Sequence, residues 1–169
     1  MMAIMAERLY REPTEAEKAK LYELYLQVFN SNFSLSKKRS VITAVLGYEV
    51  WSWRVTGISH NALLAIKANN YRYPKTTLVR DHNPPRSVTY KKTFGEMPLD
   101  FHDWWNTVWN GDATTLITHG EHNKPCTLSK IYPVDVNQGL FMDKEVAGFY
   151  YTMAREGAFV QHICETENI

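Results

Sequence analysis

The sequence has few cysteines and no long apolar run, and each absence excludes a class of protein. Its 169 residues include two cysteines, Cys126 and Cys164, which form no CxxC pair, so we expect neither a structural zinc knuckle nor a disulfide framework. No run of eighteen apolar residues occurs, and the Met-rich start is followed by Glu7 and Arg8. We therefore predict no membrane-spanning helix, no secretory signal, and a cytoplasmic protein without a membrane partner.

Repeats, low-complexity tracts and obvious interdomain linkers are also absent from the sequence. A chain of this length, with 44% hydrophobic residues, can bury a proper core as one unit. We therefore expect a single domain over residues 1–169.

Acidic residues are scarce in one stretch of the chain, whereas basic residues are frequent there. Between residues 67 and 92 the only acid is Asp81, and tyrosines lie among the bases. Such a stretch suits a phosphate backbone and its sugars, although a solvated charged face is the ordinary interpretation. After residue 133 the acids outnumber the bases. The basic residues of the stretch are Lys67, Arg72, Lys75, Arg80, Arg86, Lys91 and Lys92.

Three helices are predicted in the first part of the chain. Thr14 and Glu17 form a capping box, and apolar residues then recur at helical spacing to about Asn30. A second helix opens near Ser36, and a third has Ser59 as its N-cap and ends at about Ala68. Residues 1–70 are therefore expected to be helical.

The segment before the third helix, Val55–Ser59, looks like the turn of a helix-turn-helix. Under this alternative the third helix enters a DNA groove, where His60, Asn61 and Lys67 contact bases or phosphates. The simpler alternative is a capped helix that supports the segment after it.

Two strands and a short helix are predicted further along. Thr76–Val79 is rich in β-branched residues, and a strand there carries Asp81 and His82 at its end. In a strand these two side chains point to opposite faces, so one can hold a metal ion while the other faces water. Thr115–Thr118 is the second strand, and a short helix begins near Gly120.

Segments 80–87, RDHNPPRS, and 118–124, THGEHNK, together resemble the HNH endonucleases, which carry a ββα-metal finger. The resemblance covers about a third of the chain, with a long Trp-rich insertion between its halves. It implies a β-hairpin and a short helix within residues 75–130. The middle asparagine of the family corresponds to either Asn106 or Asn110.

The resemblance implies a role for each residue of this motif. Asp81 is the first metal ligand, and His82 is the general base that takes a proton from the attacking water. Either His122 or Asn123 completes the ligand set, and His122 is favoured because imidazole is the stronger ligand. Carboxylate and imidazole ligands suit Mg²⁺ or Mn²⁺. The residues expected to meet DNA phosphates are Arg80, Arg86, Lys91, Lys92 and Lys124.

Other interpretations of the same residues stay open. Asp81 can cap a turn, His82 can be a core histidine, and His122 and Asn123 can lie on a solvated helix start. His119, His122 and Cys126 can form part of a zinc site, although a fourth ligand is distant. The tryptophans are more often core residues than base-stacking residues.

We therefore predict an α+β fold: a mainly helical single domain with an embedded ββα-metal finger and a helical or mixed segment at 131–169. A helix with an apolar stripe is expected over residues 144–155. The predicted function is metal-dependent cleavage of double-stranded DNA, as by a restriction, phage or mobile-element enzyme, and a homodimer suits a symmetric site. The alternative is a noncatalytic DNA-binding protein of helix-turn-helix type.

Overall fold

The fold is a mixed α+β arrangement in which helices outnumber strands. The computed structural model describes residues 11–124, 128–142 and 149–169. None of the helices within these ranges is long and apolar enough to cross a membrane. In chain order the elements are α1 (Glu15–Asn30), α2 (Leu35–Leu46), β1 (Val55–Ser59), α3 (His60–Ala68), β2 (Leu78–His82), α4 (Arg86–Thr93), α5 (Phe101–Asp112), β3 (Thr114–Thr118), α6 (His119–Asn123), β4 (Ile131–Pro133), η2 (Val136–Gln138), the π-helix η3 (Met153–Gly157) and α7 (Ala158–Thr166).

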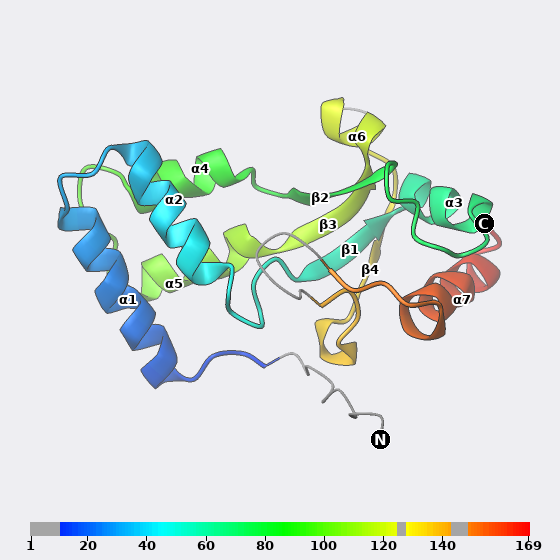
Figure 1. Ribbon diagram of the computed structural model, residues 1–169, viewed down its shortest axis with the longest axis horizontal. Helices are drawn as coiled ribbons and strands as arrows, with labels where there is room; N and C mark the ends of the chain where they lie inside the picture. The colour runs from blue at the N-terminus through cyan, green and yellow to red at the C-terminus, as the bar shows by residue number, and fades with distance from the viewer. Residues whose placement is uncertain (1–10, 125–127, 143–148) are drawn as a thin grey trace, which may run out of the picture.

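The strands form one sheet in the order β2-β3-β1-β4. β2 and β3 are antiparallel, with Leu78 opposite Thr118 and His82 opposite Thr114. β1 is parallel to β3 and antiparallel to β4. Gly57 lets β4 approach closely, because a Cβ atom there would lie 2.7 Å from the Ile131 side chain. The strand pair β2–β3 is followed directly by α6, which stands beside both strands (Figure 1).

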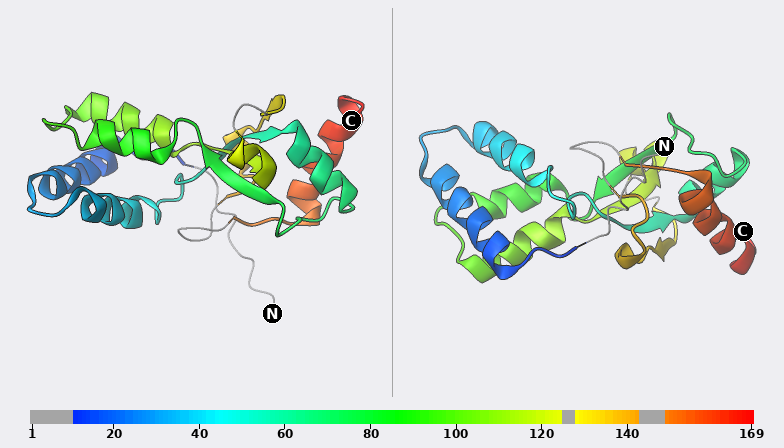
Figure 2. Two further views of the ribbon diagram at one scale, coloured as in Figure 1. Left: turned by 90° about the horizontal axis from the view of Figure 1, so that it is seen from above. Right: turned by 60° about the horizontal axis from the view of Figure 1, so that its bottom comes forward.

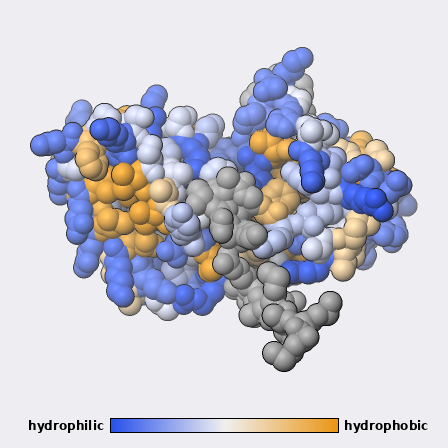
Figure 3. All heavy atoms as spheres, in the orientation of Figure 1, coloured by the Kyte–Doolittle hydropathy of each residue, from blue (hydrophilic) through white to orange (hydrophobic). Residues whose placement is uncertain are grey.

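The hydrophobic core is divided between two halves of the molecule (Figures 1 and 2). In the helical half, α1, α2, α4 and α5 surround a cluster that includes Tyr25, Trp51 and Trp104, each at most 1% exposed. In the sheet half, α3 and α7 pack with apolar residues of the strands. The prediction that the tryptophans belong to a core is therefore confirmed for Trp51, Trp104 and Trp105. Further apolar residues gather on the surface over α1 and α2 (Figure 3).

Local hydrogen bonds explain where the predicted helices begin. Thr14 and Glu17 form the expected capping box of α1. Ser59 accepts from the backbone N–H of Ala62 at the start of α3, as expected for an N-cap. The two strands and the short helix predicted around residues 76–124 are present as β2, β3 and α6. The α+β class is therefore confirmed.

Two predicted elements are wrong. Val55–Ser59 is strand β1 and not the turn of a helix-turn-helix, because both of its edges are hydrogen-bonded, to β3 and to β4. Residues 1–70 are accordingly not purely helical. The helix predicted over 144–155 lies partly outside the described residues; residues 149–152 form no helix, and the π-helix η3 begins only at Met153.

Candidate functional site

Asp81 and His82 are the last two residues of β2, and their side chains lie on opposite faces of the sheet. The burial of β2 alternates along the strand, with Asp81 partly exposed and His82 only 7% exposed. This is the period of two that a strand imposes on its side chains. The Asp81 face is open to solvent, whereas the His82 face is closed.

Asp81 meets His122, which comes from helix α6. The Asp81 Oδ1 and His122 Nδ1 atoms are 3.1 Å apart, and the two side chains are 39% and 46% exposed. β3 lies between the two residues in the chain, and its antiparallel pairing with β2 brings α6 back over β2. Residues that are 41 positions apart in sequence therefore converge on one solvent-facing point.

The separation of these two atoms fits a shared divalent cation as well as a hydrogen bond. Two adjacent ligands of an octahedral Mg²⁺ ion, each about 2.1 Å from the metal, are about 3.0 Å apart. The distance between Asp81 Oδ1 and His122 Nδ1 is 3.1 Å. Within the described ranges no group of three or more His, Cys, Asp or Glu side chains converges, so this pair supplies two ligands. Mg²⁺ commonly fills its remaining positions with waters and phosphate oxygens.

Glu121 fixes helix α6 in the position that this contact requires. Its side chain is only 3% exposed, and it forms a capping box with Thr118. It accepts hydrogen bonds from Ser59 Oγ at 2.8 Å, Asn61 Nδ2 at 3.1 Å and the Ser129 backbone N–H at 3.1 Å. Burial alone would raise the pKa of Glu121, but the hydrogen bonds from Ser129, Thr118 and Ser59 outweigh it and lower the pKa to about 2.

Glu121 has a structural role that the sequence prediction did not include. The sequence contains a local signal for this role, because a Thr followed by a Glu three residues later is the pattern of a capping box. Its further partners from β1, α3 and the segment at Ser129 could not be predicted from local sequence, since they depend on the tertiary fold.

His82 lies on the other face of the sheet and is not brought to the Asp81–His122 pair. Its ring packs edge-on against Trp53, with ring centroids 4.5 Å apart. Its Nε2 atom is buried and makes no hydrogen bond to any described residue. Burial, together with the positive charges of Arg86 and Arg80, lowers the pKa of His82 to about 3. The ring is therefore a neutral core histidine near neutral pH.

Arg80 and Arg86 also point inward, although both were predicted to meet DNA phosphates. Arg80 is 9% exposed, donates to the Trp53 carbonyl oxygen at 3.1 Å and stacks on the Trp53 ring. Arg86 lies 4.6 Å from the centroid of the same ring and donates to Tyr90 Oη at 2.6 Å. The predicted contacts of these two residues with a phosphate backbone are not supported by their positions.

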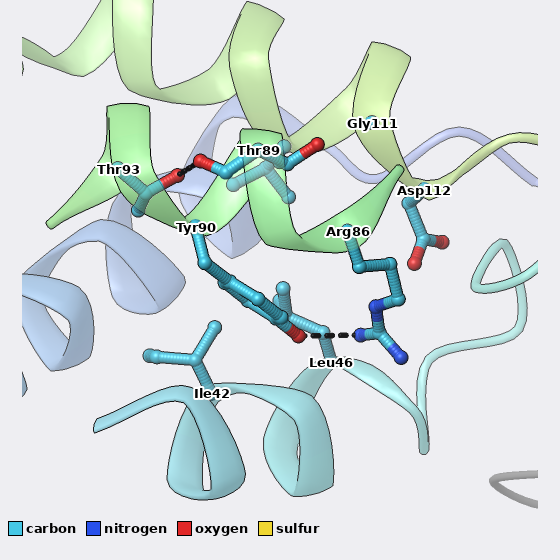
Figure 4. A pocket seen from close by; sticks show the side chains of 9 residues that line it. Ile42, Leu46, Arg86, Thr89, Tyr90, Thr93, Gly111 and Asp112 are labelled. Atoms are coloured by element: carbon cyan, nitrogen blue, oxygen red, sulfur yellow. Dashed lines mark hydrogen bonds between the residues drawn. The ribbon is translucent and has the colours of Figure 1, made fainter. Parts of the chain in front are cut away.

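Asp112 shares this interior with Arg86 (Figure 4). Its carboxylate accepts from the Trp53 backbone N–H at 2.7 Å. Burial raises the pKa of Asp112 to about 6, although this hydrogen bond and the charges of Arg86 and Arg54 oppose the increase. The small cavity around Arg86, Tyr90 and Asp112 in Figure 4 is thus part of the packing between α2, α4 and α5.

The remaining predicted residues are distributed over several surfaces. Lys91 and Lys92 are exposed on α4, Asn123 and Lys124 are exposed at the end of α6, and Asn106 and Asn110 are exposed on α5. Residues of α3 are already engaged within the fold: His60 stacks on Tyr132, Asn61 binds Glu121, and Lys67 donates to the Ile169 carbonyl oxygen. Cys126, the third residue of the zinc alternative, lies outside the described residues.

A scan against protein-family models, a search of curated proteins and a search of solved structures each found no match.

Proposed function

We propose that this chain is a metal-dependent endonuclease that hydrolyses phosphodiester bonds in DNA, with a site of the ββα-metal type. The observation that carries the proposal is the contact between Asp81 Oδ1 and His122 Nδ1 at 3.1 Å. Two antiparallel strands followed by a short helix, with one ligand on the first strand and one on the helix, are the arrangement that such a finger requires.

Asp81 and His122 hold the cation in this proposal. Both side chains are partly exposed, which leaves room for a phosphate oxygen and waters. A bound Mg²⁺ or Mn²⁺ ion would supply charge for the phosphoryl oxygen and a more acidic bound water. Asn123 is exposed and has no contact with Asp81 of the kind that His122 makes, so we assign the second ligand to His122.

Neighbouring residues orient the ligands and attract the substrate. Glu121 fixes α6, so that His122 faces β2. Lys124 follows α6 and is exposed, and we assign its ammonium group to the attraction of a DNA phosphate. His82 is assigned no part in proton transfer, because its buried ring faces away from the Asp81 side of the sheet.

A cleavage assay tests this proposal. Purified protein is incubated with several unrelated supercoiled plasmids and genomic DNAs, with Mg²⁺ or Mn²⁺ and with a chelator. We expect nicking that requires the metal and falls at least a hundredfold in Asp81→Asn and in His122→Ala. Asp103→Asn and His162→Ala are matched controls, because they make the same changes at exposed positions on α5 and α7.

Nicking that survives both ligand variants would contradict the proposal. A loss in Asn123→Ala with His122→Ala unaffected would move the second ligand to Asn123. His82→Ala separates the two accounts of His82: a loss of nicking in a variant that keeps its thermal stability would restore this histidine as the general base.

A further inference from the structure

A groove opens between α4 and α5, beyond the end of β2. Its volume is about 190 Å³, and its walls come from both helices and from the loop after β2. Pro84 is three residues after Asp81, so their Cα atoms are at most about 11 Å apart. The groove therefore begins close to the strand end that carries the Asp81 ligand. It is lined by Pro84, Val88, Thr89, Lys92, Asn106, Thr107, Asn110 and Gly111.

The groups that line the groove favour an anionic ligand with hydrogen-bonding edges. Asn106 and Asn110 are one helical turn apart, so their amides lie on the same side of α5. Lys92 adds a positive charge from α4, and no acidic residue lines the groove. The amides can donate and accept hydrogen bonds at once, as the edge of a nucleobase requires.

Two hydroxyl groups in the wall lack partners. Thr107 is 9% exposed, and its Oγ1 atom makes no hydrogen bond within the described part of the chain. The Oγ1 atom of Thr89, on the facing helix α4, is also buried and makes no hydrogen bond to a described residue. Both oxygen atoms are closed off from solvent, and Thr89 packs against Gly111 between the two helices, so the polar contacts of a ligand in the groove come from Lys92, Asn106 and Asn110.

We propose that this groove binds one unpaired nucleotide of a DNA strand, an inference that rests on the proposed function. Lys92 contacts the phosphate, and the Asn106 and Asn110 amides contact the base edge. Pro84 and the half-exposed Val88 supply apolar contact for the sugar or the base face. The base must be unpaired, because a concave site of this size admits a base only when it has left the duplex stack.

Binding of a labelled single-stranded oligonucleotide, measured by fluorescence anisotropy in chelator, tests this inference without requiring cleavage. We expect the double variant Asn106→Ala/Asn110→Ala to weaken binding about tenfold, as for loss of one good base-edge contact. Lys92→Ala should weaken it by a similar factor. Lys91→Ala is the matched comparison, because it removes the same charge from the adjacent exposed position, which does not line the groove, and should cost only about twofold.

Equal losses in Lys91→Ala and Lys92→Ala, with no effect of the asparagine variants, would overturn the inference, because binding would then be general charge attraction. Failure of the native protein to bind any single strand would also overturn it. A fully paired duplex should show no effect of the asparagine variants, and an equal effect would contradict the requirement for an unpaired base. Metal-dependent nicking is scored separately, so the groove can fail while the proposed function stands.

Discussion

Adjacent residues at the end of β2 have opposite environments, and their chemistry follows from this difference. Asp81 is partly exposed beside His122, whereas His82 is buried against Trp53. An imidazole in such a place resists protonation, because the charged form would lose its hydration and lie near Arg86 and Arg80. His82 therefore contributes to stability in a way that depends on pH.

The free energy of unfolding should decrease as the pH falls from 6.5 towards 3 because of His82. Its pKa is lowered from 6.5 to about 3 by folding, so the unfolded chain binds the proton more tightly in this range. Stability from this residue is complete above pH 6.5 and decreases by at most about 5 kcal/mol as the pH reaches 3. In His82→Phe, which keeps an aromatic ring against Trp53, this decrease should be absent.

Urea unfolding of both proteins at pH 7 and pH 4.5 measures the effect. Asp112 has the opposite effect on stability. Because its pKa is raised to about 6, the folded state holds the proton more tightly than the unfolded chain between pH 6 and 3.8, so this residue adds stability as the pH falls. Asp112 is present in both proteins, so its contribution cancels in the comparison. Identical changes in unfolding free energy for the two proteins between these pH values would show that His82 is not buried as described.

At the scale of the elements, helices α4 and α5, which lie between β2 and β3 in the chain, pack closely against each other at Gly111. Gly111 on α5 faces Thr89 on α4, and a Cβ atom at Gly111 would lie 2.5 Å from the Thr89 Cγ2 and Oγ1 atoms. A β-branched side chain has little freedom to move away. The glycine is therefore required for the packing of α4 on α5.

Gly111→Ala should destabilise the protein by about 1 to 3 kcal/mol, as is usual for overpacking. Thr89→Ala removes the two closest atoms, so the double variant should recover most of the loss. Gly120→Ala is the matched control, because it is also helical but its Cβ atom would have no neighbour closer than 3.8 Å. Thermal unfolding followed by circular dichroism compares these four variants with the native protein, and additive losses in the double variant would contradict the contact.

The elements were largely predictable where the signal was local, whereas the site was predictable only in part. Capping patterns at Thr14 and Ser59 gave the starts of α1 and α3, because a cap needs only the next few residues. β1 was missed because its partners, β3 and β4, come from later in the chain. The meeting of Asp81 with a residue of α6 was expected from a motif, and His122 was preferred to Asn123 because imidazole is the stronger ligand. The register of β2 on β3, which brings His122 to Asp81, had no local signal.

No local sequence signal showed that two predicted DNA contacts, Arg80 and Arg86, and the predicted general base, His82, point inward. Arg80, His82 and Arg86 are all buried or partly buried around Trp53, a residue far from them in the chain. A basic stretch predicts charge on the surface only if its side chains face outward, and this depends on packing between distant segments.

At the scale of the whole molecule, Trp53 joins the helical half to the sheet half. Its backbone N–H binds Asp112 of α5, and its carbonyl oxygen accepts from Arg80 of β2 and from Thr114 Oγ1 of β3. It has a φ of 56°, which is uncommon for an aromatic residue, so these contacts hold the backbone in an unfavourable region. Trp53 therefore couples the two cores, together with its neighbour Arg54, which donates to the Trp109 carbonyl oxygen of α5 and accepts from Thr114 of β3.

Trp53→Ala should lower the free energy of unfolding by about 3 kcal/mol, because it removes a large ring packed against His82 and two arginines. Both halves should then unfold in one transition at a lower temperature. Hydrogen exchange at amides of α1 and of β3 reports on the two halves separately. Tyr48→Ala, in the same connection but 73% exposed, is the control and should change stability by less than about 0.5 kcal/mol.

The partners of Glu121 also determine when the site can form during synthesis of the chain. Two of them lie about sixty residues earlier, at Ser59 and Asn61, and the other lies eight residues later, at Ser129. While Ser129 is still inside the ribosome, the nascent chain lacks the hydrogen bonds that this residue donates to Glu121, so α6 is held over β2 by fewer contacts. Under the proposed function, the full ability to bind the metal and cut DNA is therefore acquired only after most of the fold has been made.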